Sequence, residues 1–115
     1  MKIIKRSDWG LEKRRTYLRY RVFSQKDLDL KGCVLQIVVF KSGQEILKHY
    51  HKGMTETYIV LGGNGLVTVN DEEMRLEKDD ILLIEKANWH SIKNDRPEDF
   101  IIAICKYNID DTFLW

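Results

Sequence analysis

The sequence has few cysteines, no long hydrophobic run and no excess of charge of one sign. Cys33 and Cys105 each lie in an apolar run, so we expect buried free thiols. A single disulfide between them stays an open alternative, although it would not make a disulfide-stapled scaffold. No apolar run approaches the roughly 20 residues of a membrane-spanning helix, and the N-terminus lacks the apolar stretch of a signal peptide. We therefore expect no membrane partner and a cytoplasmic location.

The balance of charge argues against a dedicated nucleic-acid-binding protein. The chain carries 19 lysines and arginines against 18 acidic residues, a net charge of +1, whereas nucleic-acid binders show a strong basic excess. Apolar residues make up 43% of the chain, which is typical of a globular protein. A length of 115 residues suits one domain and leaves no room for two. We expect a single domain over residues 1–115 and no nucleic-acid partner.

Helical periodicity is scarce, and short apolar runs alternate with turn residues throughout the chain. This pattern is typical of an all-β sandwich or barrel. Asn70-Asp71 predicts a two-residue hairpin turn, and residues 8–15 fit either a helical turn or a loop. The expected strands cover residues 16–23, 33–40, 44–51, 55–61, 66–69, 73–76, 81–85, 89–93 and 100–107.

The two ends of the chain extend beyond the central part of this pattern. Residues 1–31 read as an N-terminal strand and loop extension. Residues 108–115 form a tail that ends in the apolar stretch Thr112 to Trp115. Because tails fray unless something holds them, we expect this one to pack on the barrel or on a second subunit. A homodimer with twofold symmetry is the expected assembly.

The chain has only three histidines, and their spacing suggests a metal site. His49 and His51 are two residues apart, which places both side chains on one face of a strand. A turn then brings Glu56 back beside them at the start of the next strand, and His90 lies on another short strand. Three imidazoles and one carboxylate suit iron, manganese, cobalt, nickel, copper or zinc. We predict that these four residues bind one divalent transition metal, whose identity the sequence leaves open.

Two stretches of the sequence resemble the two signatures of the cupin superfamily. In the first, Gly43 is followed after five residues by His49, then by His51, after four more residues by Glu56, and after six more by Gly63. Every fixed position of the signature is matched.

The second stretch keeps His90 and Asn94 of the other cupin signature. It has Asp79, Glu85 and Ala87 where the family usually has glycine, proline and glycine. Those positions shape turns and hold no metal ligand, so the resemblance still implies a metal site.

The resemblance implies a double-stranded β-helix, or jelly roll, of six or more strands. It implies that His49, His51, Glu56 and His90 are the metal ligands and that a small-molecule pocket lies at the mouth of the barrel. The stretch from Tyr50 to Gly65 also resembles phosphomannose-isomerase-like and other sugar-processing members, a broad label because one fold hosts many functions.

Strand alternation from the ligands predicts which residues line the pocket. Leu47 would share a face with His49, Tyr58 with Glu56, and Ile92 with His90. Tyr58 then either donates a hydrogen bond to a substrate or is an ordinary core residue. Arg19 and Arg21, which share a strand face, either clamp an anionic group, are simply solvated, or lie at a subunit contact.

Three functions fit these observations. The first is a metal-dependent enzyme that acts on a small polar molecule, of the sugar isomerase or epimerase type or of the dioxygenase type. The second is a non-catalytic module that binds a sugar or an organic acid beside a structural metal. The third is a closed site in which the metal only staples the barrel.

Overall fold

The computed structural model describes residues 1–109 and consists almost entirely of antiparallel strands. The strands are β1 (Gly10–Lys13), β2 (Leu18–Phe23), β3 (Val34–Phe40), β4 (Glu45–His49), β5 (Thr55–Gly62), β6 (Asn64–Val69), β7 (Glu72–Glu77), β8 (Ile81–Ile84), β9 (His90–Lys93) and β10 (Phe100–Tyr107), and the short helix α1 spans Gln25–Leu28. The predicted all-β class is confirmed.

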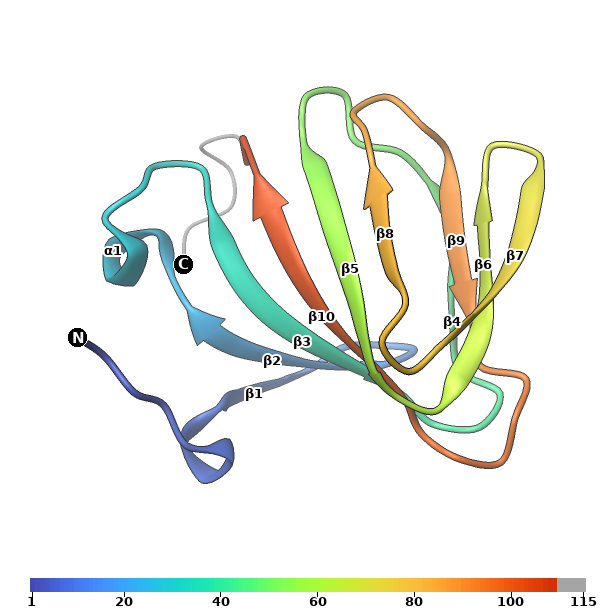
Figure 1. Cartoon of the computed structure of the whole chain (residues 1–115), viewed down its shortest axis with the longest axis horizontal. Coiled ribbons are helices and arrows are strands. Elements are labelled where there is room, and N and C mark those ends of the chain that lie inside the picture. Colours follow the sequence, from blue (N-terminus) through green and yellow to red (C-terminus); the bar gives the residue numbers. More distant parts are fainter. Residues whose placement is uncertain (110–115) are drawn as a thin grey trace.

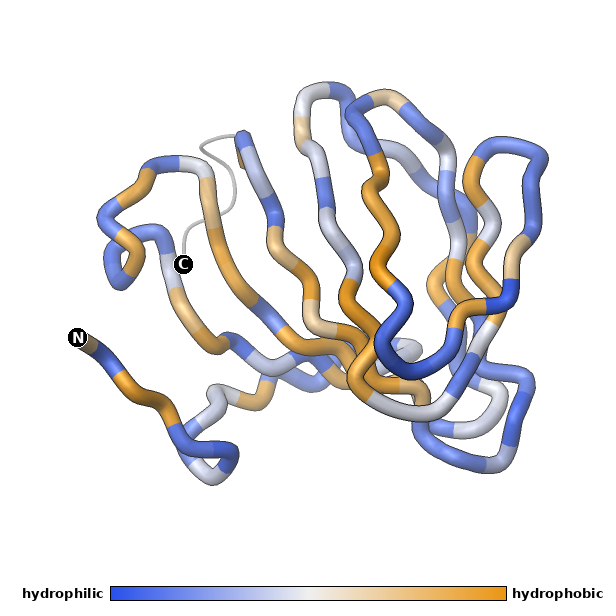
Figure 2. Tube along the Cα trace, in the orientation of Figure 1, coloured by the Kyte–Doolittle hydropathy of each residue, from blue (hydrophilic) through white to orange (hydrophobic). Residues whose placement is uncertain are grey.

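Two sheets face each other across one core (Figure 1). One has six strands in the order β1-β2-β3-β10-β5-β8, and the other has four in the order β4-β9-β6-β7. Each strand of the larger sheet points alternate residues into the core, as in β10, where Phe100, Ile102 and Ile104 are buried. Val67 of β6 and Ile92 of β9 meet them from the smaller sheet. Hydrophobic segments lie in many of the strands while the turns are mostly hydrophilic (Figure 2). Buried apolar side chains from both sheets form one cluster, which is the core between them.

The expected strands are found within a few residues of their predicted bounds, with one addition. Residues 8–15 were expected to form a helical turn or a loop, but β1 lies there and pairs with β2. Glu12 is directly opposite Arg19 in this pairing and accepts hydrogen bonds from Arg14, Arg19 and Arg21. A cross-strand pair of opposite charges stabilises such a register, which explains a strand in a segment without alternating hydrophobicity.

The remaining local predictions have mixed outcomes. The hairpin between β6 and β7 turns at Asn70, whose φ is 53°, as predicted. Both cysteines are free and half-buried, so no disulfide joins them. The apolar stretch of the tail lies outside the described residues. Ile109, just before it, packs with Val34 and Met54. No helix in residues 1–109 is long and apolar enough to cross a membrane.

Candidate metal centre and pocket

The three histidines converge at one end of the space between the sheets. His49 is the last residue of β4 and His90 the first of β9, and the two are directly opposite each other in the strand pairing. Their ring centroids are 4.2 Å apart, and the ring of His51 lies 5.0 Å from that of His49 and 5.5 Å from that of His90. One nitrogen from each ring lies within 4.8 Å of the nitrogens from the other two. That spacing allows a single ion to contact all three.

His51 reaches the cluster by a different route from the one predicted. β4 ends at His49, so His51 lies two residues beyond the strand and strand alternation does not place it. The backbone N–H of Ala87 donates to the carbonyl of His51 over 2.8 Å. This bond ties the His51 segment to the turn that leads into His90. The expectation of a strand up to residue 51 was wrong, although the two histidines still point to the same place.

Glu56 supplies the carboxylate beside the histidines. It is the second residue of β5 and only 3% exposed. Its Oε1 lies 3.1 Å from Nε2 of His90 and 3.6 Å from Nε2 of His51. Four side chains from three strands and one loop thus lie close together. Three are the clustered histidines, and the fourth, Glu56, contacts His51 and His90.

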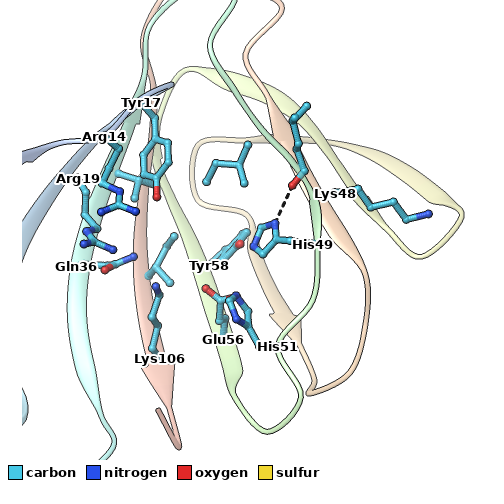
Figure 3. Close-up of a pocket in the computed structure, with 14 residues that line it drawn as sticks. Arg14, Tyr17, Arg19, Gln36, Lys48, His49, His51, Glu56, Tyr58 and Lys106 are labelled. Carbon is cyan, nitrogen blue, oxygen red and sulfur yellow. Dashed lines mark hydrogen bonds and ion pairs between the residues drawn. The ribbon is translucent and has the colours of Figure 1, made fainter. Parts of the chain in front are cut away.

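Backbone carbonyls fix the orientation of two of the imidazoles. The Nδ1 of His49 lies 2.8 Å from the carbonyl of Leu47 (dashed line in Figure 3), and the Nδ1 of His90 lies 2.9 Å from that of Asn88. A carbonyl only accepts hydrogen bonds, so each Nδ1 carries a proton and donates it. The neutral ring then presents the lone pair of Nε2, the form in which histidine binds metals.

At His90 this lone pair faces another acceptor. Nε2 of His90 and Oε1 of Glu56 are both buried, and neither has a hydrogen-bond partner among the described residues. Two acceptor atoms 3.1 Å apart repel each other unless a proton or a cation lies between them, and orphaned buried polar atoms are rare in native proteins. The donor set of the cluster therefore fits a bound metal ion.

The pKa values of the cluster follow from the same contacts. Burial lowers the pKa of His49 and of His51, so both rings favour the neutral form. Burial acts in the same direction on His90, but the Glu56 carboxylate and the Asn88 carbonyl raise its pKa overall. Burial acts to raise the pKa of Glu56, and contact with His90 together with the charge of Lys106 lowers it overall. Contact with the Glu56 carboxylate thus favours the protonated form of His90, whereas burial favours the neutral form of His49 and His51.

A cavity of about 380 Å³ opens beside the cluster (Figure 3). His49, His51 and Glu56 line it, whereas His90 is 2% exposed and is not among the residues that line it. The opposite wall is basic and polar, and carries Arg14, Arg19, Gln36 and Lys106. A metal at the cluster would thus border a space large enough for a small molecule.

The three predicted pocket residues occupy different places. Tyr58 lines the cavity, is 2% exposed, and has a pKa raised well above its usual value by burial, so its phenol stays neutral. Leu47 borders the cavity but is 73% exposed, because a bulge between Ile46 and His49 interrupts the alternation of β4. Ile92 is 1% exposed in the core and is not among the residues that line this cavity.

Sequence reasoning missed most of the basic wall. Arg19 and Arg21 were weighed together as an anion clamp or as solvated residues, but only Arg19 is buried, at 6% exposed, and lines the cavity. Gln36 and Lys106 were not considered at all. Each is a polar residue at an inward position of a strand whose other inward residues are apolar, and that interruption was the available signal.

Comparison with known proteins identifies the fold. The family model of the cupin domain matches residues 36–105. The chain is 35% identical over 52 residues to the tetracenomycin polyketide synthase protein TcmJ of Streptomyces glaucescens, a match that covers 45% of this chain and only 35% of that protein.

Two solved structures share the architecture at low identity. One is a predicted oxalate decarboxylase from Thermotoga maritima, with a TM-score of 0.87 and 16% identity over 94% of this chain and 100% of the other. Another is a putative sugar phosphate isomerase from Acidithiobacillus ferrooxidans, with a TM-score of 0.75 and 18% identity over 94% of this chain and 76% of the other. The predicted double-stranded β-helix is confirmed.

Proposed function

The chain belongs to the cupin family, and on that basis we propose that it is a single-domain metalloprotein, over residues 1–115, that acts on a small polar molecule. His49, His51, His90 and Glu56 are the proposed ligands of one divalent transition metal. The cavity of about 380 Å³ beside them is the proposed ligand pocket. Its presence argues against a closed site in which the metal only staples the barrel.

One observation carries the metal site. The buried Nε2 of His90 and Oε1 of Glu56 are two acceptors 3.1 Å apart that lack a hydrogen-bond partner among the described residues. Imidazole and carboxylate ligands suit iron, manganese, cobalt, nickel, copper or zinc. When bound, such an ion supplies a Lewis acid that can polarise a carbonyl or activate water.

The protein's own residues have defined tasks in this arrangement. The carbonyls of Leu47 and Asn88 hold the rings of His49 and His90 with Nε2 toward the cluster. Tyr58 is kept as a neutral phenol by burial at the cavity, so its hydroxyl can donate a hydrogen bond to a ligand. Glu56 and His90 are 3% and 2% exposed, and burial strengthens the polar contact between them.

We favour a metal-dependent enzyme of the sugar isomerase or epimerase type or of the dioxygenase type. Support comes from the open pocket beside the ligands and from the two solved relatives, whose names describe a putative sugar phosphate isomerase and a predicted oxalate decarboxylase.

The alternative is a non-catalytic module that binds a sugar or an organic acid beside a structural metal. One observation favours it. Among the described residues that line the cavity, every carboxylate and imidazole belongs to the metal cluster. A general acid or base would then have to come from another kind of side chain.

Metal binding is tested on protein stripped with a chelator and titrated separately with manganese, iron(II), cobalt, nickel, copper and zinc. We expect one equivalent to bind at least one of these ions by calorimetry and to raise the melting temperature. His51→Ala is expected to lose tenfold or more in affinity. Lys48→Ala is the matched control, because Lys48 points away from the cluster (Figure 3) and should bind as the wild type does. Binding that survives His51→Ala and His90→Ala together would disprove the site.

Catalysis is tested on the metal-loaded protein. A thermal-shift screen of sugars, sugar phosphates, keto acids and hydroxy acids identifies ligands, and NMR then follows each ligand over long incubation. Conversion that disappears after demetallation supports an enzyme. A ligand that binds and stays unchanged supports the binding module.

The assembly and location of the chain are also proposals. The outer face of β5 and β8 exposes Leu61 (42%), Ile81 (68%) and Leu83 (55%), an apolar patch of the kind that subunit interfaces cover. We therefore propose a homodimer. Light scattering after size exclusion should give twice the chain mass, and Leu83→Glu should give a monomer. Two free cysteines fit a reducing compartment, which supports a cytoplasmic location.

A further inference from the structure

We propose that the wall of the cavity opposite the histidines is an oxyanion subsite, which binds a carboxylate or phosphate group of the ligand through Arg19 and an adjacent hydroxyl through Gln36. This inference rests on the proposed function in one respect, which is that the other end of the ligand would lie at the metal. It narrows the substrate class to small hydroxylated acids or phosphate esters.

The subsite is built on the inner face of the larger sheet. Gln36 of β3 is paired with Ile104 of β10, which is paired in turn with Tyr58 of β5. Two residues further along the same two strands, Lys106 of β10 is paired with Glu56 of β5. The basic wall and the metal cluster therefore share one continuous surface, and Figure 3 shows both facing the same cavity.

Two buried atoms of this wall lack a partner. Arg19 is 6% exposed and Gln36 is 2% exposed. Nε of Arg19 and Oε1 of Gln36 have no hydrogen-bond partner among the described residues. Leaving such atoms unpaired is costly, so their retention at a cavity is best explained by a ligand that satisfies them. The guanidinium needs an acceptor and the amide oxygen needs a donor, which an oxyanion and a hydroxyl would provide.

The charge of the wall has the sign that an anion requires. Arg14, Arg19 and Lys106 line the cavity, and the only carboxylate among its described lining residues, Glu56, belongs to the metal cluster. Glu12, on β1, accepts hydrogen bonds from Arg14, Arg19 and Arg21. One carboxylate shared by three guanidinium groups fixes their positions and leaves a net positive charge. A guanidinium held in this way loses less conformational freedom when it binds an oxyanion.

The size of the cavity limits the ligand. About 380 Å³ lies near the lower end of the roughly 300–1,000 Å³ typical of small-molecule pockets. The space must hold both the group at the metal and the group at Arg19. We therefore expect a ligand of a few carbons, short enough to span the two walls.

The test uses calorimetry on the full chain, both metal-free and loaded with the ion that binds best. The probes are glycolate, acetate, inorganic phosphate and glycolaldehyde phosphate, with ethylene glycol as the neutral control. Binding of glycolate identifies a carboxylate ligand, and binding of glycolaldehyde phosphate identifies a phosphate ester. Either result supports the subsite. Ethylene glycol that binds as tightly as the anions, or anions that do not bind at all, would overturn it.

Arg19→Gln should weaken anion binding at least tenfold. Arg75→Gln is the matched control, because Arg75 lies on β7 of the smaller sheet, pairs with Asp95 and does not line the cavity, and it should change affinity by less than twofold. Arg19→Lys keeps the charge and loses Nε, so it should also bind more weakly, and it serves if Arg19→Gln fails to fold. Unchanged affinity in a folded Arg19 variant would refute the proposal.

Gln36→Met separates a binding role from a structural one. The substitution removes the unpaired amide oxygen at nearly constant length, so it should raise the melting temperature while glycolate binding falls at least fivefold and acetate binding changes little. A lower melting temperature with unchanged glycolate binding would show that Gln36 serves the fold.

The two proposals fail in distinguishable ways. If anions bind the metal-free protein through Arg19 but no metal binds, the subsite stands and the metal site is wrong. If a metal binds and no anion does, the metal site stands and the subsite is wrong.

Discussion

Replacing Ala87 by glycine should stabilise the protein. Ala87 lies in the turn between β8 and β9 with a φ of 65°, in the left-handed region that costs an L-residue about 1–2 kcal/mol. Glycine has no such cost, although its greater freedom in the unfolded chain offsets about 0.5–1 kcal/mol of the gain. We expect the free energy of unfolding to rise by about 0.5–1 kcal/mol.

The expected change is measurable by thermal denaturation. An unfolding entropy of about 2.1 cal/mol/K per residue gives about 0.24 kcal/mol/K for 115 residues, so Ala87→Gly should raise the melting temperature by about 2–4 °C. The measurement is made with a chelator present, because a bound metal would add its own stabilisation.

Ala103→Gly is the control, since Ala103 lies in the middle of β10 and its replacement should cost about 0.5–1 kcal/mol. An Ala87→Gly protein that melts at or below the wild-type temperature would refute this reasoning.

Two further substitutions test the turns and the charge network. Gly63→Ala should lower the free energy of unfolding, measured by urea denaturation, by about 3 kcal/mol or more. The reason is that its φ is +69° and an added Cβ would lie 2.1 Å from the carbonyl oxygen of Asp99. Gly43→Ala should lower it by only about 1–2 kcal/mol, because Gly43 has a φ of +81° but open space around it. Burial acts to raise the pKa of Glu12, but three arginines lower it overall to about 2, so its carboxylate stabilises the fold above pH 4.5 and loses this effect as the pH falls through 2. Glu12→Gln should therefore cost about 1 kcal/mol at pH 7, after allowance for solvent screening, and an equal deficit at pH 2 would contradict the assignment.

The strands could be predicted because alternation and turn residues are local signals. β10 shows this well, since each of its inward residues up to Ile104 is apolar. β1 could not be predicted in this way, because its four residues, Gly10–Lys13, carry no alternation and are held by pairing with β2. Helix α1 had a signal that was overlooked. Ser24 and Asp27 form a capping box, with Ser24 Oγ accepting from the N–H of Asp27 and the Asp27 carboxylate accepting from the N–H of Ser24.

The candidate site could be predicted in part. The spacing of His49, His51, Glu56 and His90 identified four side chains that the fold does bring together. Their exact approach could not be derived, because the bulge in β4 depends on pairing with β9. The same bulge leaves Leu47 largely exposed, where simple alternation places it beside His49.

The departures from the cupin signature also gain a physical meaning from the backbone. Asp79 and Ala87 replace two of the usual glycines, and both adopt positive φ, at 76° and 65°. The family pattern has glycine there because that conformation disfavours a Cβ. The loop before His90 therefore keeps its geometry at the cost of some strain. In this geometry the N–H of Ala87 donates a hydrogen bond to the carbonyl of His51. The bond ties the His51 segment to the turn before His90 and so holds two members of the histidine cluster together.

The two arginines of the basic wall lie in a different part of the sequence from the four proposed metal ligands. The family match covers residues 36–105 and contains all four proposed metal ligands. Arg14 and Arg19, together with the Glu12 that orients them, come from β1, β2 and the turn between them, before that region. The proposed metal centre is thus built from the matched region, whereas the two arginines of the pocket wall come from the segment that precedes it. Substrate preference should therefore change with substitutions on β1 and β2 while metal affinity stays constant, and variants at Arg19 should show this separation in one protein.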